Sequence, residues 1–189
     1  MITIVDYGAG NLRSVSNALV AIGKAHRFAA STKELEAAEK ILLPGVGHFG
    51  QMMNALARTG LDRAIRSKAA EGVPLLGICL GMQALFESSE ESPGTSGLGL
   101  LSGEVIRFKG SLKIPHMGWN RVRFAGAEDF FYFANSFYVP LNPTTTGISD
   151  YGQAFSASVK KDNVEGFQFH PEKSGAAGLR LLAAWCERC

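Results

Sequence analysis

Two patterns of apolar and polar positions alternate along the first half of the chain. Short apolar runs with the length of buried strands lie at 2–5, 41–43 and 73–79, with a weaker one at 26–29. Other segments carry an apolar residue every three or four positions, which predicts amphipathic helices at 12–22, 52–56, 61–69 and 81–87. Strands that alternate with helices predict βαβ units, and therefore a doubly wound α/β fold with a mainly parallel sheet covered on both faces.

The second half of the chain has a different pattern. Short strands joined by Gly-, Pro- or Asn-containing turns are predicted at 104–108, 119–124, 130–135, 153–159 and 164–170. A last helix is predicted at 179–187, and the aromatic residues of 130–138 are expected in the strand core: Phe130, Phe131, Tyr132, Phe133, Phe137 and Tyr138. Because no linker, repeat or low-complexity tract interrupts the pattern, we expect a single domain over residues 1–189, with an antiparallel extension of the parallel sheet.

Composition narrows the class of protein only slightly. The 189 residues are 46% hydrophobic and 19% charged, as in an ordinary globular protein. A formal charge of +2, without a block of Lys and Arg, gives no reason to expect a nucleic-acid partner. No stretch has the length of a membrane span and no targeting signal is evident, so the sequence predicts a cytoplasmic protein without a membrane partner. Three cysteines, an odd number, fit reduced thiols in that compartment.

The first candidate for chemistry is Cys79, in the sequence Gly77-Ile78-Cys79-Leu80-Gly81. It lies where an apolar strand meets a predicted helix, and flanking glycines leave room for the strained turn that exposes a nucleophile. A helix N-terminus also favours the thiolate. The alternative, a buried structural cysteine, is equally compatible with these five residues alone.

A second motif, Phe169-His170-Pro171-Glu172, favours a catalytic Cys79 over a structural one. A histidine at a strand end, with a carboxylate two residues later, can act as an oriented base for a nucleophile. A strand end followed by a surface carboxylate is the alternative for this motif alone. Since the carboxyl ends of parallel strands meet at one edge of the sheet, we predict a catalytic triad of Cys79, His170 and Glu172.

A glycine-flanked loop, Pro44-Gly45-Val46-Gly47, follows another predicted strand. Together with the backbone N–H of Leu80, its N–H groups could stabilise an oxyanion. A tight turn into the next helix explains the glycines equally well.

Other suggestive residues receive structural interpretations. Gly8 and Gly10 resemble the start of a dinucleotide fingerprint, but Arg13 stands where the third glycine is needed, so no nucleotide cofactor is expected. Cys186 and Cys189 form an isolated C-x-x-C, for which no metal or redox role is expected. The histidines without ligand-like spacing are interpreted as packed or solvated: His26, His48 and His116.

The segments GICLGMQ (77–83), PGVG (44–47) and FHPE (169–172) together resemble the class I glutamine amidotransferases. DYGAGNL (6–12) and PHMGWN (115–120) narrow the resemblance to the glutaminase subunits of imidazole glycerol phosphate synthases, nearly end to end. The related amidotransferases of anthranilate and GMP synthases usually carry His where this chain has Met82. The resemblance implies a flavodoxin-like fold.

The resemblance also implies a reaction. Cys79 would attack the carboxamide of glutamine, and His170 would manage the proton, so that a thioester forms, ammonia leaves and water then releases glutamate. Gln83 and Glu91 would bind the amino-acid end of glutamine. Ser136 and Phe137 would hold its carboxylate.

A partner is implied as well, since ammonia lost to bulk water becomes a non-nucleophilic ammonium ion. In the family a separate cyclase subunit, a (β/α)₈ barrel, takes up the ammonia and makes imidazole glycerol phosphate and an aminoimidazole carboxamide ribotide in histidine biosynthesis. The two subunits would form a heterodimer. The expected interface residues are Asn11, Met117, Trp119 and Asn135.

Two departures from the family concern the segment after residue 134. The family usually has His-Ser-Tyr where this chain has Asn135, Ser136 and Phe137. We therefore hypothesise an altered coupling to the partner, with the triad unaffected. Three alternatives remain open: a γ-glutamyl peptidase that needs no partner, the amidotransferase subunit of a different synthase, and a non-catalytic subunit that retains the fold.

Overall fold

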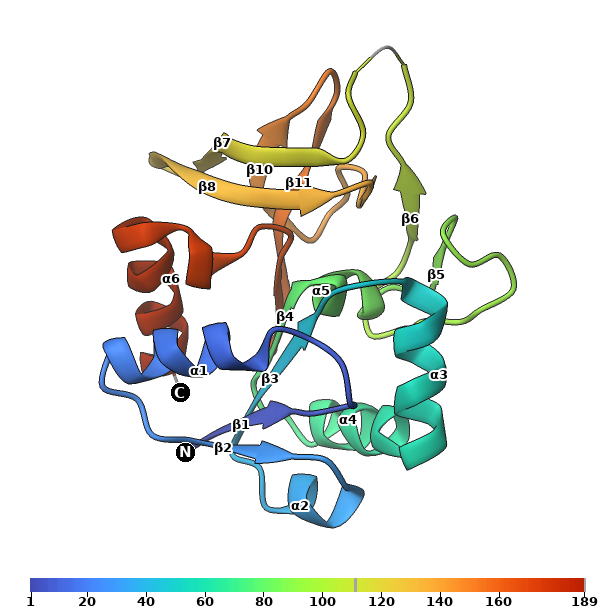
Figure 1. Ribbon diagram of the computed structural model, residues 1–189, viewed down its shortest axis with the longest axis vertical. Coiled ribbons are helices and arrows are strands. Elements are labelled where there is room, and N and C mark those ends of the chain that lie inside the picture. Colours follow the sequence, from blue (N-terminus) through green and yellow to red (C-terminus); the bar gives the residue numbers. More distant parts are fainter. Residues whose placement is uncertain (111, 189) are drawn as a thin grey trace.

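The computed structural model describes residues 1–110 and 112–188 (Figure 1). Its main sheet runs in the order β2-β1-β3-β4-β12-β11-β10-β7-β8. The parallel strands are β1 (Ile2–Val5), β2 (His26–Ala29), β3 (Lys40–Gly45), β4 (Leu75–Cys79) and β12 (Val164–Phe167). The antiparallel strands are β7 (His116–Phe124), β8 (Ala127–Asn135), β10 (Thr145–Asp150) and β11 (Ala154–Lys161).

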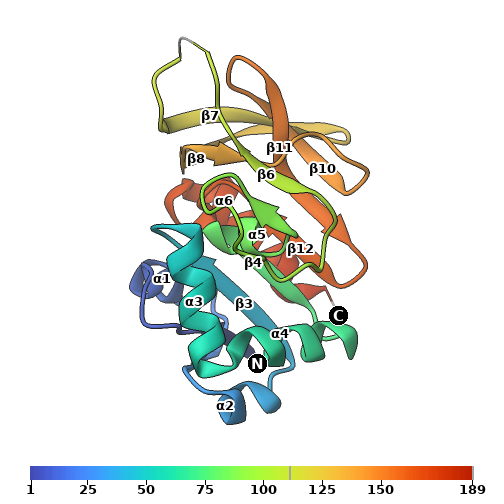
Figure 2. The same cartoon turned by 90° about the vertical axis from the view of Figure 1, so that its right-hand side faces the viewer.

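Helices cover both faces of the parallel part of the sheet. The helices are α1 (Leu12–Ala21), α2 (Thr32–Glu36), α3 (Phe49–Thr59), α4 (Leu61–Ala70), α5 (Leu80–Ala84), α6 (Gly175–Glu187) and the 3₁₀ turn η1 (Pro171–Lys173). Figures 1 and 2 show α1 and α6 on one face and α2, α3 and α4 on the other. Each face has its own apolar core: Val15, Leu19 and Trp185 belong to the first, and Leu35 and Leu56 to the second.

A small second sheet lies beside the carboxyl ends of the parallel strands. It runs in the order β5-β6-β9, from β5 (Ser88–Ser89), β6 (Glu104–Arg107) and β9 (Phe137–Tyr138). The predicted fold class, a parallel α/β sheet with an antiparallel extension, is therefore confirmed.

Several elements escaped the sequence patterns: the short strands β5 and β9, the turn η1, the helix α2 and the strand β10. The helix α2 is a single turn, too short for a periodicity, although its capping box of Ser31 and Glu34 is readable in the sequence. The strand β10 is mostly polar and lies inside the antiparallel extension, so it has neither the apolar run nor the regular alternation of a predicted strand.

The prediction that 130–138 forms an all-core aromatic cluster is wrong for one face of β8. Phe131 and Phe133 are buried, and Phe131 stacks on Phe169 with ring centroids 4.2 Å apart. Phe130 is 55% exposed, because neighbouring residues of a strand point to opposite faces of the sheet. Tyr132 is half-buried on the same outer face.

The predicted strand 164–170 ends three residues early, at Phe167. Beyond it the chain changes partner, because the N–H of His170 donates to the carbonyl of Tyr132 in β8 at 2.9 Å. Cys189, the second cysteine of the C-x-x-C motif, lies outside the described residues. Within the described ranges, no helix combines the length and hydropathy that crossing a bilayer requires.

Candidate active site

Cys79 is the last residue of β4, and its backbone is strained. Its backbone angles, a φ of 55° and a ψ of −112°, lie in a region that residues other than glycine rarely adopt. The neighbouring glycines are sterically required. A Cβ on Gly77 would come within 2.6 Å of the carbonyl oxygen of Gly81, and one on Gly81 would overlap the carbonyl oxygen of Leu43. The geometry is that of a nucleophile elbow, in which the sharp turn presents the side chain at the sheet edge.

His170 and Glu172 form a buried pair next to this elbow. Nδ1 of His170 lies 2.8 Å from Oε1 of Glu172, and the two side chains are 5% and 2% exposed. The hydroxyl of Ser174 donates to the carbonyl of His170 at 2.6 Å and accepts from the N–H of Tyr132 at 2.9 Å. The histidine is thus fixed on one side by a carboxylate and on the other by β8.

Strand register brings the thiol and the imidazole together. β12 pairs in parallel with β4, with Phe167 opposite Ile78, so the chains leading to Cys79 and His170 leave the same edge of the sheet. Both residues line one pocket of about 320 Å³, a volume at the lower end of small-molecule sites.

Electrostatics favour a charged imidazole. Burial lowers the pKa of His170, but hydrogen bonds to Cys79 and Glu172, together with their negative charges, outweigh burial and raise this pKa to about 10. At neutral pH the ring therefore carries a proton, and it can stabilise a thiolate and later deliver the proton to a leaving group.

Three of the four predicted oxyanion residues lie in the lining of the same pocket. Val46, Gly47 and Leu80 line it directly. Gly45 is opposite Cys79 in the register of β3 and β4, and a side chain there would overlap the backbone of Gly81. Gly47 has a φ of 96°, which glycine adopts at low cost. This backbone can therefore approach the thiol closely.

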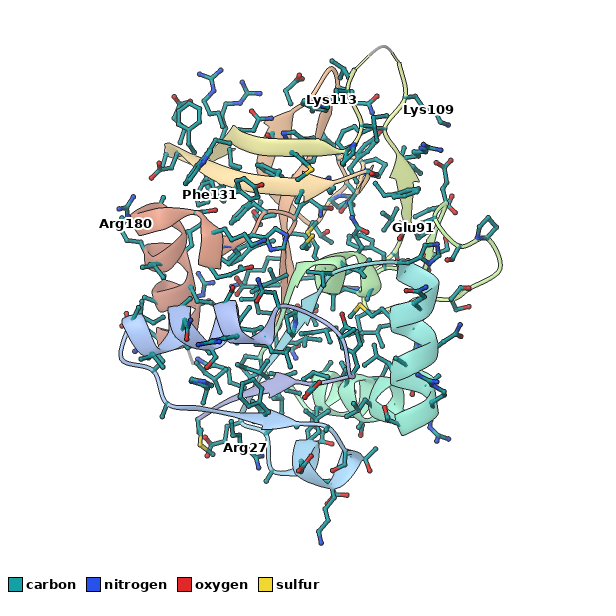
Figure 3. All side chains as sticks on the ribbon, viewed as in Figure 1. Arg27, Glu91, Lys109, Lys113, Phe131 and Arg180 are labelled. Atoms are coloured by element: carbon teal, nitrogen blue, oxygen red, sulfur yellow. The ribbon has the colours of Figure 1, made fainter. Side chains whose placement is uncertain are left out.

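Gln83 and Glu91 supply acceptor oxygens to the same pocket. Both N–H groups of the Gln83 amide are in use, since Nε2 donates to the carbonyl of Phe137 at 3.0 Å and to Oε1 of Gln168 at 2.9 Å. Only the Gln83 oxygen remains for a ligand. Glu91 accepts from the N–H of Phe49 at 2.7 Å, at the start of α3 (Figure 3). An ammonium group suits this pair of acceptors.

The segment 135–137 closes the pocket on the side of β8. The carbonyl of Ser136 accepts from the N–H of Phe108 at 3.1 Å, which ties the segment to the end of β6. Asn135 was expected at a partner interface, but it is only 5% exposed, lines the pocket and donates from Nδ2 to the carbonyl of Phe137 at 2.9 Å. The structure therefore places this side chain inside the site.

The other expected interface residues are exposed. Met117 and Trp119 in β7 are 64% and 57% exposed, on the same strand face as the exposed Phe130 of β8. Trp119 packs edge-on against Tyr132, with ring centroids 6.3 Å apart. Asn11 is also exposed, but its side chain caps α1 by accepting from the N–H of Ser14. The apolar residues form an outer face on β7 and β8, which we call the β7–β8 face (Met117, Trp119, Phe130 and Tyr132).

The three histidines other than His170 have structural contacts of their own. His116 is buried between Phe133 and Tyr151, with ring centroids 4.9 and 4.0 Å away. Burial lowers the pKa of His116 to about 4. His48 caps α3, and Nε2 of His26 lies 2.7 Å from the hydroxyl of Ser16.

Gln168 and Lys173 were not anticipated. Lys173 lines the pocket, and Gln168 is fully buried next to Cys79. A readable indication existed for Gln168, because it is polar and precedes His170 by two positions, which places both on one face of an extended segment.

A family model and two curated relatives match nearly the whole chain. The family model described as "Glutamine amidotransferase class-I" matches residues 3–187. "Imidazole glycerol phosphate synthase subunit HisH" of Thermus thermophilus is 49% identical over 95% of this chain and 93% of that protein. The protein of the same name from Methanothermobacter thermautotrophicus is 45% identical over 99% and 98%.

A solved structure described as "Crystal structure of glutamine amidotransferase" has a TM-score of 0.82 at 20% identity, over 99% of this chain and 98% of that one. At this identity the likeness concerns the fold alone. The family match and the two relatives carry the assignment, and all three cover nearly the whole chain. The chain belongs to the class I glutamine amidotransferase family.

Proposed function

We propose that this chain is the glutamine-hydrolysing subunit of an imidazole glycerol phosphate synthase and acts in histidine biosynthesis. The relatives that are 45–49% identical over nearly their whole length carry the name of that subunit. The observation that carries the chemistry is the strained Cys79 elbow in one pocket with a buried His170–Glu172 pair.

The first half-reaction makes a thioester. The Cys79 thiolate attacks the carboxamide carbon of glutamine, and the developing oxyanion is stabilised by backbone N–H groups of the 45–47 segment and of Leu80. His170 gives its proton to the amide nitrogen as the carbon–nitrogen bond breaks. The products are a glutamyl thioester, ammonia and a neutral imidazole, which Glu172 keeps oriented through Nδ1.

Hydrolysis then restores the site. The neutral imidazole of His170 removes a proton from water, the resulting hydroxide attacks the thioester carbon, and the carbon–sulfur bond breaks. Glutamate leaves, and Cys79 and His170 return to the thiolate–imidazolium pair. The Gln83 oxygen and Glu91 would accept hydrogen bonds from the substrate's ammonium group, while the backbone of 136–137 would hold its carboxylate.

A partner subunit is part of this proposal. Free ammonia is protonated in water, so its productive use requires transfer to a second active site. We propose that a cyclase of the (β/α)₈-barrel type docks on the β7–β8 face to form a heterodimer. Met117 of this face is opposite Ala134 in the register of β7 and β8, and Ala134 lines the pocket. The apolar face is therefore continuous with the wall of the site.

Glutamate release, measured with and without the cyclase subunit and an analogue of its substrate, tests the assignment. We expect slow hydrolysis by the isolated chain, strong stimulation by the partner, and loss of both activities in Cys79→Ser. Cys186→Ser is the matched control and should behave as the wild type. Turnover of γ-glutamyl peptides without a partner would favour the peptidase alternative.

Labelling by an electrophilic glutamine analogue tests the role of Cys79 as nucleophile independently of the assignment to a synthase. Label on Cys79 without stimulation by the cyclase would contradict the synthase assignment and leave the thiol chemistry intact. An absence of label would contradict the catalytic role itself. We also propose a cytoplasmic location and a single domain over residues 1–189.

A further inference from the structure

Gln168 is a buried polar residue that the proposed mechanism does not use. Its side chain has no exposed surface, and it lies between two residues of the pocket wall. Oε1 accepts from Nε2 of Gln83 at 2.9 Å, and Nε2 lies 3.9 Å from Sγ of Cys79, a long N–H···S contact. The orientation of the amide is settled by the Gln83 contact, because Gln83 donates there and to a carbonyl.

The contacts of Gln83 extend this chain of hydrogen bonds to the segment 135–137. Gln83 donates to the carbonyl of Phe137 at 3.0 Å, and Asn135 donates to the same carbonyl at 2.9 Å. A carbonyl oxygen has two lone pairs, so this acceptor is saturated. A continuous polar connection therefore links the segment 135–137, through Gln83 and Gln168, to the thiol.

A buried amide in contact with a thiol has an electrostatic effect beyond filling space. An N–H that points at sulfur favours the thiolate over the thiol, and it restricts the sulfur to one position. The effect depends on the amide being held, because a free glutamine side chain has several rotamers and two amide orientations. In this structure the Gln83 contact holds it.

We propose that Gln168 is a positioning residue for Cys79 and that Gln83 couples it to the Phe137 carbonyl, so that the nucleophile and the segment 135–137 act as one polar unit. The inference rests on the proposed role of Cys79 as nucleophile. Gln168 itself does not touch glutamine. It acts on the reaction through the thiol and through the placement of Gln83.

The pH dependence of Cys79 alkylation by iodoacetamide tests this proposal, with the modified peptide quantified by mass spectrometry so that other thiols do not contribute. Gln168→Met keeps an unbranched side chain of similar length and removes both polar groups. We expect the pH–rate profile of Gln168→Met to shift to higher pH by about 0.5–1 unit. At a pH on the rising part of the profile, alkylation of Cys79 would then be about threefold to tenfold slower than in the wild type. The exposed Gln51→Met on α3 is the matched control and should not shift.

Gln83→Met supplies the second measurement. The hydrogen bonds of Gln83 go to Gln168 and Phe137, so a packing role for Gln168 alone would leave the thiol profile of Gln83→Met unchanged. We expect a shift in the same direction as for Gln168→Met, and a double variant whose shift is no larger than that of Gln168→Met, because residues of one network are not additive. Should Gln168→Met fail to fold, the Gln83→Met profile decides alone.

Three results would overturn the inference: an unchanged profile in Gln168→Met, an unchanged profile in Gln83→Met, or shifts that add in the double variant. The failure of this inference differs from the failure of the proposed function. If Cys79→Ser retained glutaminase activity, the nucleophile would be wrong. If the wild type were active and partner-stimulated while Gln168→Met kept its thiol profile, only the role of Gln168 would be wrong.

Discussion

Replacing Glu172 with glutamine tests how strongly the carboxylate controls His170. The two side chains are almost fully buried, and Oε1 of Glu172 lies 2.8 Å from Nδ1 of His170. Glutamine has nearly the same volume and keeps an acceptor oxygen, but it carries no charge. The substitution therefore removes the electrostatic contribution and disturbs the packing little.

The expected magnitude follows from the balance at His170. Burial lowers the pKa of this histidine, while Cys79 and Glu172 together raise it from 6.5 to about 10. With the charge of Glu172 removed, we expect this pKa to fall by about 1–2 units, which corresponds to about 1.4–2.7 kcal/mol of preference for the imidazolium form. The thiolate–imidazolium pair should then break up at a lower pH, and the alkaline limit of glutaminase activity should move down with it.

The same shift has a consequence for stability. The folded-state pKa of His170 lies above its unfolded value, so the protonated ring stabilises the fold fully at low pH, and this stabilisation is lost as the pH rises toward 10. The free energy of unfolding of the wild type should exceed that of Glu172→Gln near neutral pH. The difference should shrink as the pH approaches 10.

Ring-proton or ¹³C NMR of labelled histidine measures the pKa directly, with the His170 resonance assigned by its loss in His170→Asn. The exposed Glu36→Gln on α2 is the matched control and should leave the His170 titration unchanged. A His170 pKa in Glu172→Gln within about 0.3 unit of the wild type would refute the reasoning, because it would mean that the buried carboxylate contributes little charge stabilisation.

Three further predictions follow from other parts of the molecule. Gly81→Ala should lower the free energy of unfolding, measured in urea, by at least about 2–3 kcal/mol, because the added methyl group would overlap the Leu43 carbonyl. In the control Gly126→Ala the methyl group meets no atom within 4 Å, so the free energy of unfolding should fall by only about 1 kcal/mol, from the positive φ. Trp119→Ala should keep the basal glutaminase rate and melting temperature but weaken calorimetric binding of the cyclase by about 2 kcal/mol or more, and equal affinity would move the docking site elsewhere. Burial lowers the pKa of His116 from 6.5 to about 4, so the unfolded chain binds a proton more readily than the folded chain between these pH values. The free energy of unfolding should therefore fall by up to about 3 kcal/mol as the pH falls from 6.5 to 4. His116→Phe should flatten this part of the curve of stability against pH, and an unchanged slope would exclude His116 as its source.

The agreement between pattern and structure is closest in the parallel half of the sheet. β1 and β2 have the predicted boundaries, and β3, β4, α1 and α4 differ by a few residues at most. The strands β1, β3 and β4 are almost wholly buried within the sheet, so their apolar runs are nearly continuous and are visible in the sequence. The strands of the antiparallel half are less visible in the sequence, because β8 and β10 each expose one face and mix polar and apolar residues.

The elbow at Cys79 is an example of what a short segment determines on its own. Glycines at 77 and 81 are required by contacts within one strand–turn–helix unit and with the adjacent β3. The pattern of glycines is visible in the sequence, whereas the contact of Gly81 with Leu43 exists only when β3 lies beside this unit. His170 and Glu172 are two residues apart and interact locally.

Other features of the site depend on segments far apart in the chain. Three features arise only in the folded chain, where residues at the ends of β8, β9 and β12 meet β4 and α5: the burial of Asn135, the saturated carbonyl of Phe137 and the contact of Gln168 with Cys79. Sequence spacing holds no information on which of two amide orientations a buried glutamine adopts, because its partners come from other elements. By itself, the sequence determined the fold class, through local periodicity, and it predicted the triad from turn sterics and from the position of strand ends. The tertiary structure alone decided which polar groups are already paired, and therefore which remain free for glutamine, because pairing is a property of segments that meet only in the folded chain.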